Sequence, residues 1–492
     1  MQYIIGIDQS TQGTKALLFD GAGRPILRRD LPHRQIINDV GWVEHDPEEI
    51  LDNTVGVVRL LLSDAGVDQK DVAGIGISNQ RETAVVWDRK TGKPLYNAVV
   101  WQCGRAKDIC DDIERRGFAD MIKSRTGLRL SPYFTAGKLA WVLRNVPEAK
   151  ELCGTGRLGC GTVDSWLVNR LTNGREYRTE YSNASRTQLF NIIDLKWDEE
   201  ICALFGIDPK DMPEVCFSDS LFGTTDMLGC FDHRVPIHCV MGDSHAALFG
   251  QGCHSKGMVK ATYGTGSSVM MNVGDKPVFS DSIVTSLAWG LDGRVDYVLE
   301  GNLNYTGAII TWLRDDLKLI STAKEVGILA SKANKNDTTF IVPAFSGLGA
   351  PYWAPDAKAA IVGMTRSTGR NEIIKAAEEA IAYQVCDIVR LAEADSGIPV
   401  TQLRADGGPA RDSYLMQFQS NITGKEIRVP DDEELSAIGV ARCAGTALGI
   451  YDRTALFTGS SACVYAPRMD PDTREKKYAA WRSAVESVVG KR

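Results

Sequence analysis

Residues 3–19 read YIIGIDQSTQGTKALLF, two short apolar runs joined by a polar turn. The runs at 3–7 and 16–19 predict an antiparallel β-hairpin. The turn between them, residues 8–15, is rich in small and hydroxyl side chains. Such a turn exposes successive backbone N–H groups that can bind phosphate oxygens, and Asp8 can hold a water of a Mg²⁺ shell. An ordinary hairpin turn has the same composition, so this turn alone leaves both interpretations open.

The same pattern returns in the second half of the chain. Two strand-like runs, 259–263 and 268–273, flank the small polar turn Gly264-Thr265-Gly266-Ser267. A third candidate is Asp406-Gly407-Gly408, between a predicted strand and a predicted helix. Its glycines let backbone approach a ligand, although a tight strand-to-helix turn is the alternative. One hairpin of this kind in each half predicts two related domains that face a shared cleft.

Other signals extend this α/β organisation. A helix is predicted from Asp46-Pro47, with acidic residues in its first turn, to about residue 66. Longer helical patterns cover 372–394 and 434–450, and a buried strand covers 72–78. Glycines around residues 250–257 loosen the chain between the two hairpin units. We therefore expect an N-terminal domain at 1–247 and a C-terminal domain at 248–492, each with one of the two hairpin turns.

Composition limits the classes of function. The 492 residues carry a net charge of −7 and no basic run, which argues against nucleic acid as a partner. No stretch approaches the roughly 18 apolar residues of a membrane span, and the N-terminus lacks a basic signal-peptide region. The 12 cysteines form no C-x-x-C pair or zinc-type cluster, so free thiols are expected. We expect a cytoplasmic protein that binds neither nucleic acid nor membrane and assembles as a homo-oligomer, a dimer.

Three familiar motifs fail on context. The G-x-G-x-x-G match at 154–159 follows a helical pattern at 147–152, so a dinucleotide site is not indicated. No G-x-x-x-x-G-K-[ST] sequence exists, which excludes P-loop kinases. The run Gly242-Asp243-Ser244-His245 does not meet the G-x-S-x-G pattern of hydrolases, and side chains of adjacent Ser and His diverge.

Polar residues at strand ends are candidates for a ligand site. Asn79-Gln80-Arg81-Glu82 follows the strand at 72–78, and Trp101-Gln102 follows a short apolar run. Ligand sites gather at strand ends in α/β sheets. Arg81 and Glu82 could form a merely structural salt bridge. Together with an indole face they could also bind a polyol, because charged groups bond hydroxyls while the ring covers C–H edges.

Several longer stretches carry a family resemblance that covers nearly the whole chain. They are 41–47 (GWVEHDP), 79–83 (NQRET), 97–102 (NAVVWQ), 181–187 (YSNASRT), 347–353 (GLGAPYW) and 415–420 (LMQFQS). In these stretches the chain resembles the FGGY carbohydrate kinases, and among them it is most similar to the glycerol kinases. The resemblance implies two actin-like ATPase (ribonuclease H-like) domains around a central cleft that closes on ATP and substrate. It also implies that residues 1–247 hold the polyol site and the first phosphate loop, and that residues 248–492 hold the second phosphate loop and the adenosine site.

Matching positions assign roles by that resemblance. Those that fall near the nucleotide are Thr11, Gln12, Lys15, Gly264, Thr265, Gly307, Thr311, Gly408 and Asp412. Those that fall around the polyol are Arg81, Glu82, Trp101, Tyr133, Asp243, Ser244 and Ser268. Asp243 is the expected catalytic base, and Mg²⁺ is expected at Asp8 and Asp243. The expected cofactors are ATP and Mg²⁺, and the expected partner is a small polyol or sugar.

The chain departs from the glycerol kinases at positions that bear on substrate and control. Ser244 replaces the usual Gln and Ser268 the usual Phe, and both changes predict a larger, wetter pocket. Lys15, where Arg is usual, resembles the xylulose kinases. Residues 229–234 replace a Gly-rich loop that binds a sugar bisphosphate in some relatives. A four- or five-carbon polyol such as erythritol or xylitol is therefore expected, with glycerol left open.

Two further functions stay open. A ketopentose kinase of the xylulose or ribulose type is the alternative enzyme. A catalytically silent nucleotide-binding regulator is the alternative from another class, although the presence of Asp8, Asp243 and all three turns argues against it.

Overall fold

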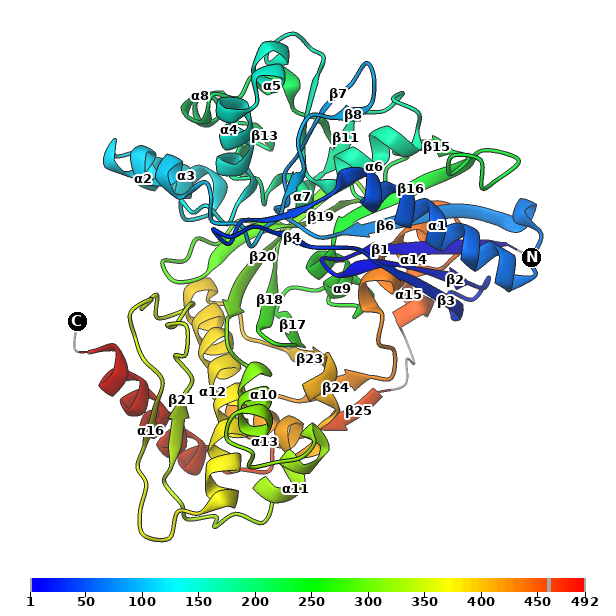
Figure 1. The fold of residues 1–492 in the computed structure, drawn as a ribbon. Helices are drawn as coiled ribbons and strands as arrows, with labels where there is room; N and C mark the ends of the chain where they lie inside the picture. The colour runs from blue at the N-terminus through cyan, green and yellow to red at the C-terminus, as the bar shows by residue number, and fades with distance from the viewer. Residues whose placement is uncertain (1, 458–461, 491–492) are drawn as a thin grey trace.

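The computed structural model describes residues 2–457 and 462–490. Figure 1 shows a large sheet in each half of the chain, and the first has the strand order β15-β16-β6-β1-β2-β3. Its strands are β1 (Tyr3–Gln9), β2 (Gly13–Phe19), β3 (Pro25–Pro32), β6 (Val72–Asn79), β15 (Gly223–Thr225) and β16 (Val235–Gly242). β1 pairs antiparallel with β2 and parallel with β6, which pairs parallel with β16. The predicted hairpin at 3–19 forms, with Asp8 opposite Lys15.

The second sheet repeats this arrangement, with the order β19-β20-β18-β17-β23-β24-β25. Its strands are β17 (Met258–Tyr263), β18 (Ser267–Gly274), β19 (Val284–Leu291), β20 (Arg294–Leu303), β23 (Gln402–Asp406), β24 (Ile427–Pro430) and β25 (Ala462–Tyr465). The hairpin β17–β18 corresponds to β1–β2, and the parallel strands β23 and β24 correspond to β6 and β16. The shared order, β3-β2-β1-β6-β16 and β20-β18-β17-β23-β24, matches the predicted pair of actin-like ATPase domains.

Three helices have equivalent places in the chain order of each unit. They are α1 (Pro47–Ala65), α6 (Val163–Leu171) and α9 (Asp243–Gly250) in the first, and α12 (Arg370–Ser396), α13 (Ser413–Thr423) and α14 (Leu435–Ala447) in the second. α1 begins and ends where its sequence signals predict. The Asp46 side chain accepts a hydrogen bond from Glu48 N at 2.9 Å, and Gly66 ends the helix in the left-handed conformation, with φ 62°.

The remaining elements lie between or after these repeated ones. In the first half they are β4 (Ile36–Ile37), β5 (Val43–His45), β7 (Val85–Asp88), β8 (Lys93–Pro94), β9 (Ala98–Val99), α2 (Lys107–Arg115), α3 (Ala119–Thr126), α4 (Thr135–Asn145), α5 (Pro147–Leu152), β10 (Leu158–Gly161), β11 (Arg178–Glu180), α7 (Tyr181–Ala184), β12 (Phe190–Asn191), β13 (Lys196–Trp197), α8 (Glu199–Phe205) and β14 (Glu214–Cys216). In the second half they are α10 (Ala308–Asp315), α11 (Val326–Ala330), β21 (Phe340–Val342), β22 (Ala360–Val362), α15 (Arg453–Phe457) and α16 (Pro471–Val489). No helix in the described ranges combines the length and apolar character needed to cross a membrane.

The two halves join through helices α9 and α14, which lie between the sheets (Figure 1). α14 follows β24 in the second half, yet it packs against β1, β6 and β16 of the first sheet. The helices cross at backbone distance, because a Cβ added at Gly439 would lie 1.9 Å from the Ala246 oxygen, and one at Gly250 2.3 Å from the Leu435 oxygen. The expected division at 247/248 falls inside the last turn of α9 and stays a prediction.

Candidate active site

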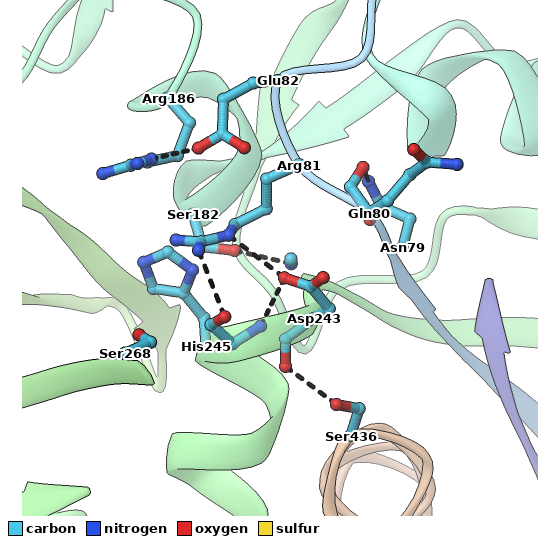
Figure 2. Close-up of polar contacts among 12 residues, drawn as sticks. Asn79, Gln80, Arg81, Glu82, Ser182, Arg186, Asp243, His245, Ser268 and Ser436 are labelled. Carbon is cyan, nitrogen blue, oxygen red and sulfur yellow. Dashed lines mark hydrogen bonds and ion pairs between the residues drawn. The ribbon is translucent and has the colours of Figure 1, made fainter. Parts of the chain in front are cut away.

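Asp243 lies where β16 ends and α9 begins, at the junction of the two halves (Figure 2). Its Oδ1 accepts hydrogen bonds from Arg81 Nε at 3.1 Å and from Ser244 N at 2.6 Å. Its backbone oxygen accepts one from Ser436 Oγ at 3.0 Å, which reaches it from α14. The side chain is 35% exposed. The carboxylate is thus held by one oxygen and accessible to a ligand.

Arg81 is the centre of a buried charge network. It follows β6, and its guanidinium donates to both Glu300 oxygens, from Nη1 at 3.1 Å and from Nη2 at 3.0 Å. Nη2 also donates to Ser244 Oγ at 3.1 Å. Glu300 is on β20 of the second sheet and is fully buried. Burial alone would raise the pKa of Glu300, but the Arg186 and Arg81 guanidiniums lower it well below its ordinary value.

Glu82 is paired with Arg186, a residue to which the sequence patterns assign no role. Arg186 Nε donates to Glu82 Oε1 at 2.5 Å, and Nη1 lies 2.9 Å from Glu300 Oε2. Glu82 has φ 61°, a conformation that costs a non-glycine residue about 1–3 kcal/mol and gathers at functional sites. Figure 2 shows Arg186 and Glu82 on one side of Arg81 and Asp243 on the other. The Arg81–Glu82 motif therefore binds two separate partners instead of pairing with itself.

Two predicted aromatic residues stand beside the first turn. The rings of Trp101 and Tyr133 pack edge to face with centroids 5.6 Å apart, and Trp101 Nε1 donates to Thr11 Oγ1 at 2.9 Å. The buried Lys138 ammonium donates to the carbonyl oxygens of Tyr133 and, at 3.0 Å, of Phe134. Burial lowers the pKa of Lys138 to about 7. The Trp101–Thr11 hydrogen bond therefore puts a residue predicted to bind the polyol in direct contact with one predicted to bind phosphate.

Asp8 is a carboxylate that the fold holds in an unfavourable environment. Burial raises its pKa to about 6 against the opposing effect of Lys15, and the nearby Asp243 and Glu434 raise it further. Ser78 Oγ donates to Asp8 Oδ1 at 2.8 Å. A divalent cation nearby would stabilise the ionised form of this buried carboxylate, so Asp8 and Asp243 could hold a Mg²⁺ ion through water. Within the described ranges, no group of three or more His, Cys, Asp or Glu side chains has metal-site geometry.

The predicted turns of the second half converge on one another. Gly407 has φ 90°, and a Cβ there would lie 1.9 Å from the Tyr263 oxygen at the end of β17. A Cβ on Gly307 would lie 2.3 Å from the Gly264 oxygen, to which Gly307 N donates at 2.9 Å. Gly408 has open space instead, with no atom within 4 Å of an added Cβ. Backbone from three separate segments therefore meets here, as a phosphate or adenosine cradle requires.

The other residues predicted to lie near the nucleotide are on separate elements of the fold. Thr265 is in the β17–β18 turn, where its oxygen accepts from Thr306 N at 3.0 Å, and Thr311 is exposed on α10. Asp412 caps α13, where Oδ1 accepts from Tyr414 N at 2.8 Å.

In the first half, the Gln12 oxygen accepts a hydrogen bond from His33 N at 3.2 Å. Lys15 pairs with Glu434 at 2.8 Å, a bond between the two halves of the chain. Among the hydrogen bonds of the described residues, none joins the turn at 10–12 to the turn at 264–266.

The two serines that depart from the glycerol kinase pattern both face the charge network. Ser244 Oγ accepts from Arg81, and Ser268 Oγ on β18 donates to Glu300 Oε1 at 3.4 Å. Beneath them, His245 is fully buried with Nε2 3.4 Å from Ser286 Oγ. Burial and the Arg81 charge lower the pKa of His245 well below its usual range. His245 is therefore neutral and stands under the site.

Sequence reasoning missed Arg186 and Glu300. Arg186 is inside the family stretch 181–187, which could have drawn attention to it. Glu300 follows the apolar pair Val298-Leu299 in a strand-like run, where an acid can indicate a buried, paired charge. The repeated fold and these converging turns are those of the actin-like ATPase class.

Comparison with known proteins gives the family. Residues 3–250 match the N-terminal domain, and residues 259–448 the C-terminal domain, of the FGGY family of carbohydrate kinases. The chain belongs to this family and is a carbohydrate kinase, an ATP-binding transferase similar to glycerol kinases over its whole length. This confirms the predicted family, fold class and enzyme class.

Three relatives illustrate the likeness. The chain is 46% identical to glycerol kinase 1 of Thermotoga maritima, over 99% of each chain. It superposes on the crystal structure of Plasmodium falciparum glycerol kinase with ADP with a TM-score of 0.94 and 35% identity, covering 100% of this chain and 99% of that one. The ligand-bound xylulose kinase of Lactobacillus acidophilus, 23% identical with a TM-score of 0.87 and coverage of 100% and 99%, shares the fold.

Proposed function

We propose that the protein transfers the γ-phosphoryl group of ATP to a hydroxyl of a four- or five-carbon polyol, with Asp243 as the base. The observation that carries the assignment is the Asp243 carboxylate. One of its oxygens is fixed by Arg81 and Ser244, while the hydrogen bonds among the described residues leave the other without a partner. A fixed carboxylate with one accessible oxygen can accept the proton of an attacking hydroxyl.

The remaining groups position the reactants. Arg81 and Glu82 would bond the polyol hydroxyls, and the rings of Trp101 and Tyr133 would cover its C–H edges. Phosphoryl transfer depends mainly on such positioning and on charge neutralisation. The backbone turns around Gly264, and Thr11 beside Trp101, would bind the phosphate chain. A Mg²⁺ ion near Asp8 would supply positive charge to the phosphate oxygens.

The two serines support an acceptor longer than glycerol. Each additional hydroxyl of a longer polyol needs a hydrogen-bond partner, since leaving it buried without one costs about 1–3 kcal/mol. Ser244 and Ser268 supply such partners where the glycerol kinases carry Gln and an apolar ring. Relatives 45–46% identical to the chain are glycerol kinases, so glycerol is the competing acceptor. The homodimer and the cytoplasmic location stay predictions.

A substrate panel tests the acceptor. ADP release would be measured with glycerol, erythritol, xylitol, ribitol, xylulose and ribulose at saturating ATP and Mg²⁺. We expect the highest kcat/KM with a four- or five-carbon polyol. Glycerol preferred by a hundredfold would refute the enlarged pocket, and a preferred ketopentose would favour the alternative supported by Lys15. No ADP release with any acceptor would refute the polyol assignment.

A further inference from the structure

Glu300 joins the two halves of the chain inside the site. It projects from β20 of the second sheet, whereas its partners Arg81 and Arg186 belong to the first half. Arg81 donates to both of its oxygens at 3.0 and 3.1 Å, and Arg186 lies 2.9 Å from one of them. The Glu300 side chain is 0% exposed, and Arg81 and Arg186 are 6% and 1% exposed. Water therefore screens these charges very little.

Side chains of alternating charge form a continuous row of contacts, in the order Glu82, Arg186, Glu300, Arg81, Asp243. Each link is a direct contact, from 2.5 Å between Arg186 and Glu82 to 3.1 Å between Arg81 and Asp243. The two acids at the ends are the ones assigned to substrate. Both reach the rest of the network only through an arginine that also contacts Glu300, so Glu300 is at the centre of this row of ion pairs.

Removing the Glu300 charge would unbalance both arginines. Breaking a buried pair by deleting one partner is costly, because the other charge stays buried and uncompensated. Arg81 and Arg186 also repel one another, and each lowers the stability of the other's charged form. Without Glu300, the carboxylates left near Arg81 are Glu82 and Asp243, and only Asp243 is already in contact with its guanidinium, so that contact should tighten. An Asp243 carboxylate gripped more strongly is a weaker base.

We propose that Glu300 is a positioning residue that orients Arg81 and Arg186, and through them Asp243 and Glu82, for phosphoryl transfer. The polyol site of the first half is then completed by one carboxylate of the second half. This inference rests on the proposed function, because it uses Asp243 as the base and Glu82 as a polyol ligand. Glu300 itself is assigned no contact with substrate.

The test compares Glu300→Gln with Asp296→Asn. Asp296 is a matched control, since it is on the same strand, 3% exposed, and paired with Arg294 at 3.1 Å. For Glu300→Gln we expect kcat/KM for the preferred polyol to fall roughly 100-fold, the scale of a misplaced reactive group. The KM for ATP should change less than about twofold, and the acid limb of the pH–rate profile should move to lower pH. Glu300→Asp should recover part of the loss, and Asp296→Asn should keep its kinetics whatever its Tm.

A milder variant covers the case in which Glu300→Gln does not fold. Arg186→Lys keeps the charge but cannot bridge Glu82 and Glu300 with a planar fork, so the polyol KM should rise about tenfold at constant ATP KM. Unchanged polyol kinetics in either variant overturn the proposal, as does an equal kinetic loss in Asp296→Asn. Normal turnover in Asp243→Asn would refute the base assignment separately, whatever Glu300→Gln shows.

Discussion

Replacing Asp243 with Asn tests the base while leaving most of the geometry in place. The amide oxygen of Asn can still accept from Arg81 Nε and Ser244 N, the two bonds that fix Oδ1 at 3.1 and 2.6 Å. The amide cannot take a proton from a hydroxyl. Loss of general-base catalysis should therefore lower kcat by roughly 10²–10⁴-fold, equivalent to about 2.7–5.5 kcal/mol of transition-state stabilisation.

Stability should change little in this variant. The Asp243 side chain is 35% exposed, so solvent screens its ion pair with Arg81 and the lost pair is worth no more than about 1 kcal/mol. The assay would measure ADP release with saturating polyol, alongside nucleotide affinity by calorimetry and the Tm. We expect a large fall in kcat with nucleotide affinity kept. Turnover within about tenfold of the parent enzyme would refute the assignment of the base.

Three further outcomes follow from named positions. Ser268→Phe should lower kcat/KM for four- and five-carbon polyols at least about tenfold and spare glycerol, and a parallel loss for all acceptors in the panel would contradict the pocket argument. Because burial holds the pKa of Asp8 at about 6, above its ordinary 3.8, its ionised form destabilises the fold. Asp8→Asn should thus raise the unfolding free energy by about 2–3 kcal/mol at pH 8 and abolish activity. The gain in unfolding free energy should fade as the pH falls from 6 to 4. A gain that does not depend on pH would argue against this. Gly407→Ala should lower the unfolding free energy by at least about 2 kcal/mol, since the φ of Gly407 is 90° and an added Cβ would meet the Tyr263 oxygen. Gly408→Ala should lower it by less than about 1 kcal/mol, because the space there is open. Equal unfolding midpoints in urea for the two variants would contradict the expected clash at Gly407.

Local elements could be predicted from the sequence because their signals are local. The helix α1 has its cap, its N-terminal proline and its terminal glycine within its own segment, and its ends agree with the structure. The two hairpins are likewise encoded by apolar runs and short polar turns. The order of strands across each sheet depends on pairings between distant segments. The packing of α14 on the first sheet was missed for the same reason.

The residues of the candidate site also differ in how well the sequence indicates them. Arg81, Glu82, Trp101 and Asp243 follow strands or strand-like runs, where a polar residue is conspicuous in the sequence. Glu300 shares its strand with another acid, Asp296, so its residue type does not single it out, and nothing nearby in the sequence indicates its partners. Arg81 and Arg186 reach it from positions 219 and 114 residues away, as the difference between their numbers shows. Pair formation over such separations follows from the fold as a whole.

The crossing of α9 and α14 has a mechanical consequence. At Gly250 and Gly439 the two backbones meet without side chains between them, so a rotation of one half against the other would have its axis near this contact. In a rotation about such a fulcrum, atoms are displaced in proportion to their distance from it. Asp243 begins the same short helix, only about 10 Å along its axis from Gly250. The Asp243 carboxylate would therefore move little in such a rotation, whereas the outlying parts of each half would move furthest.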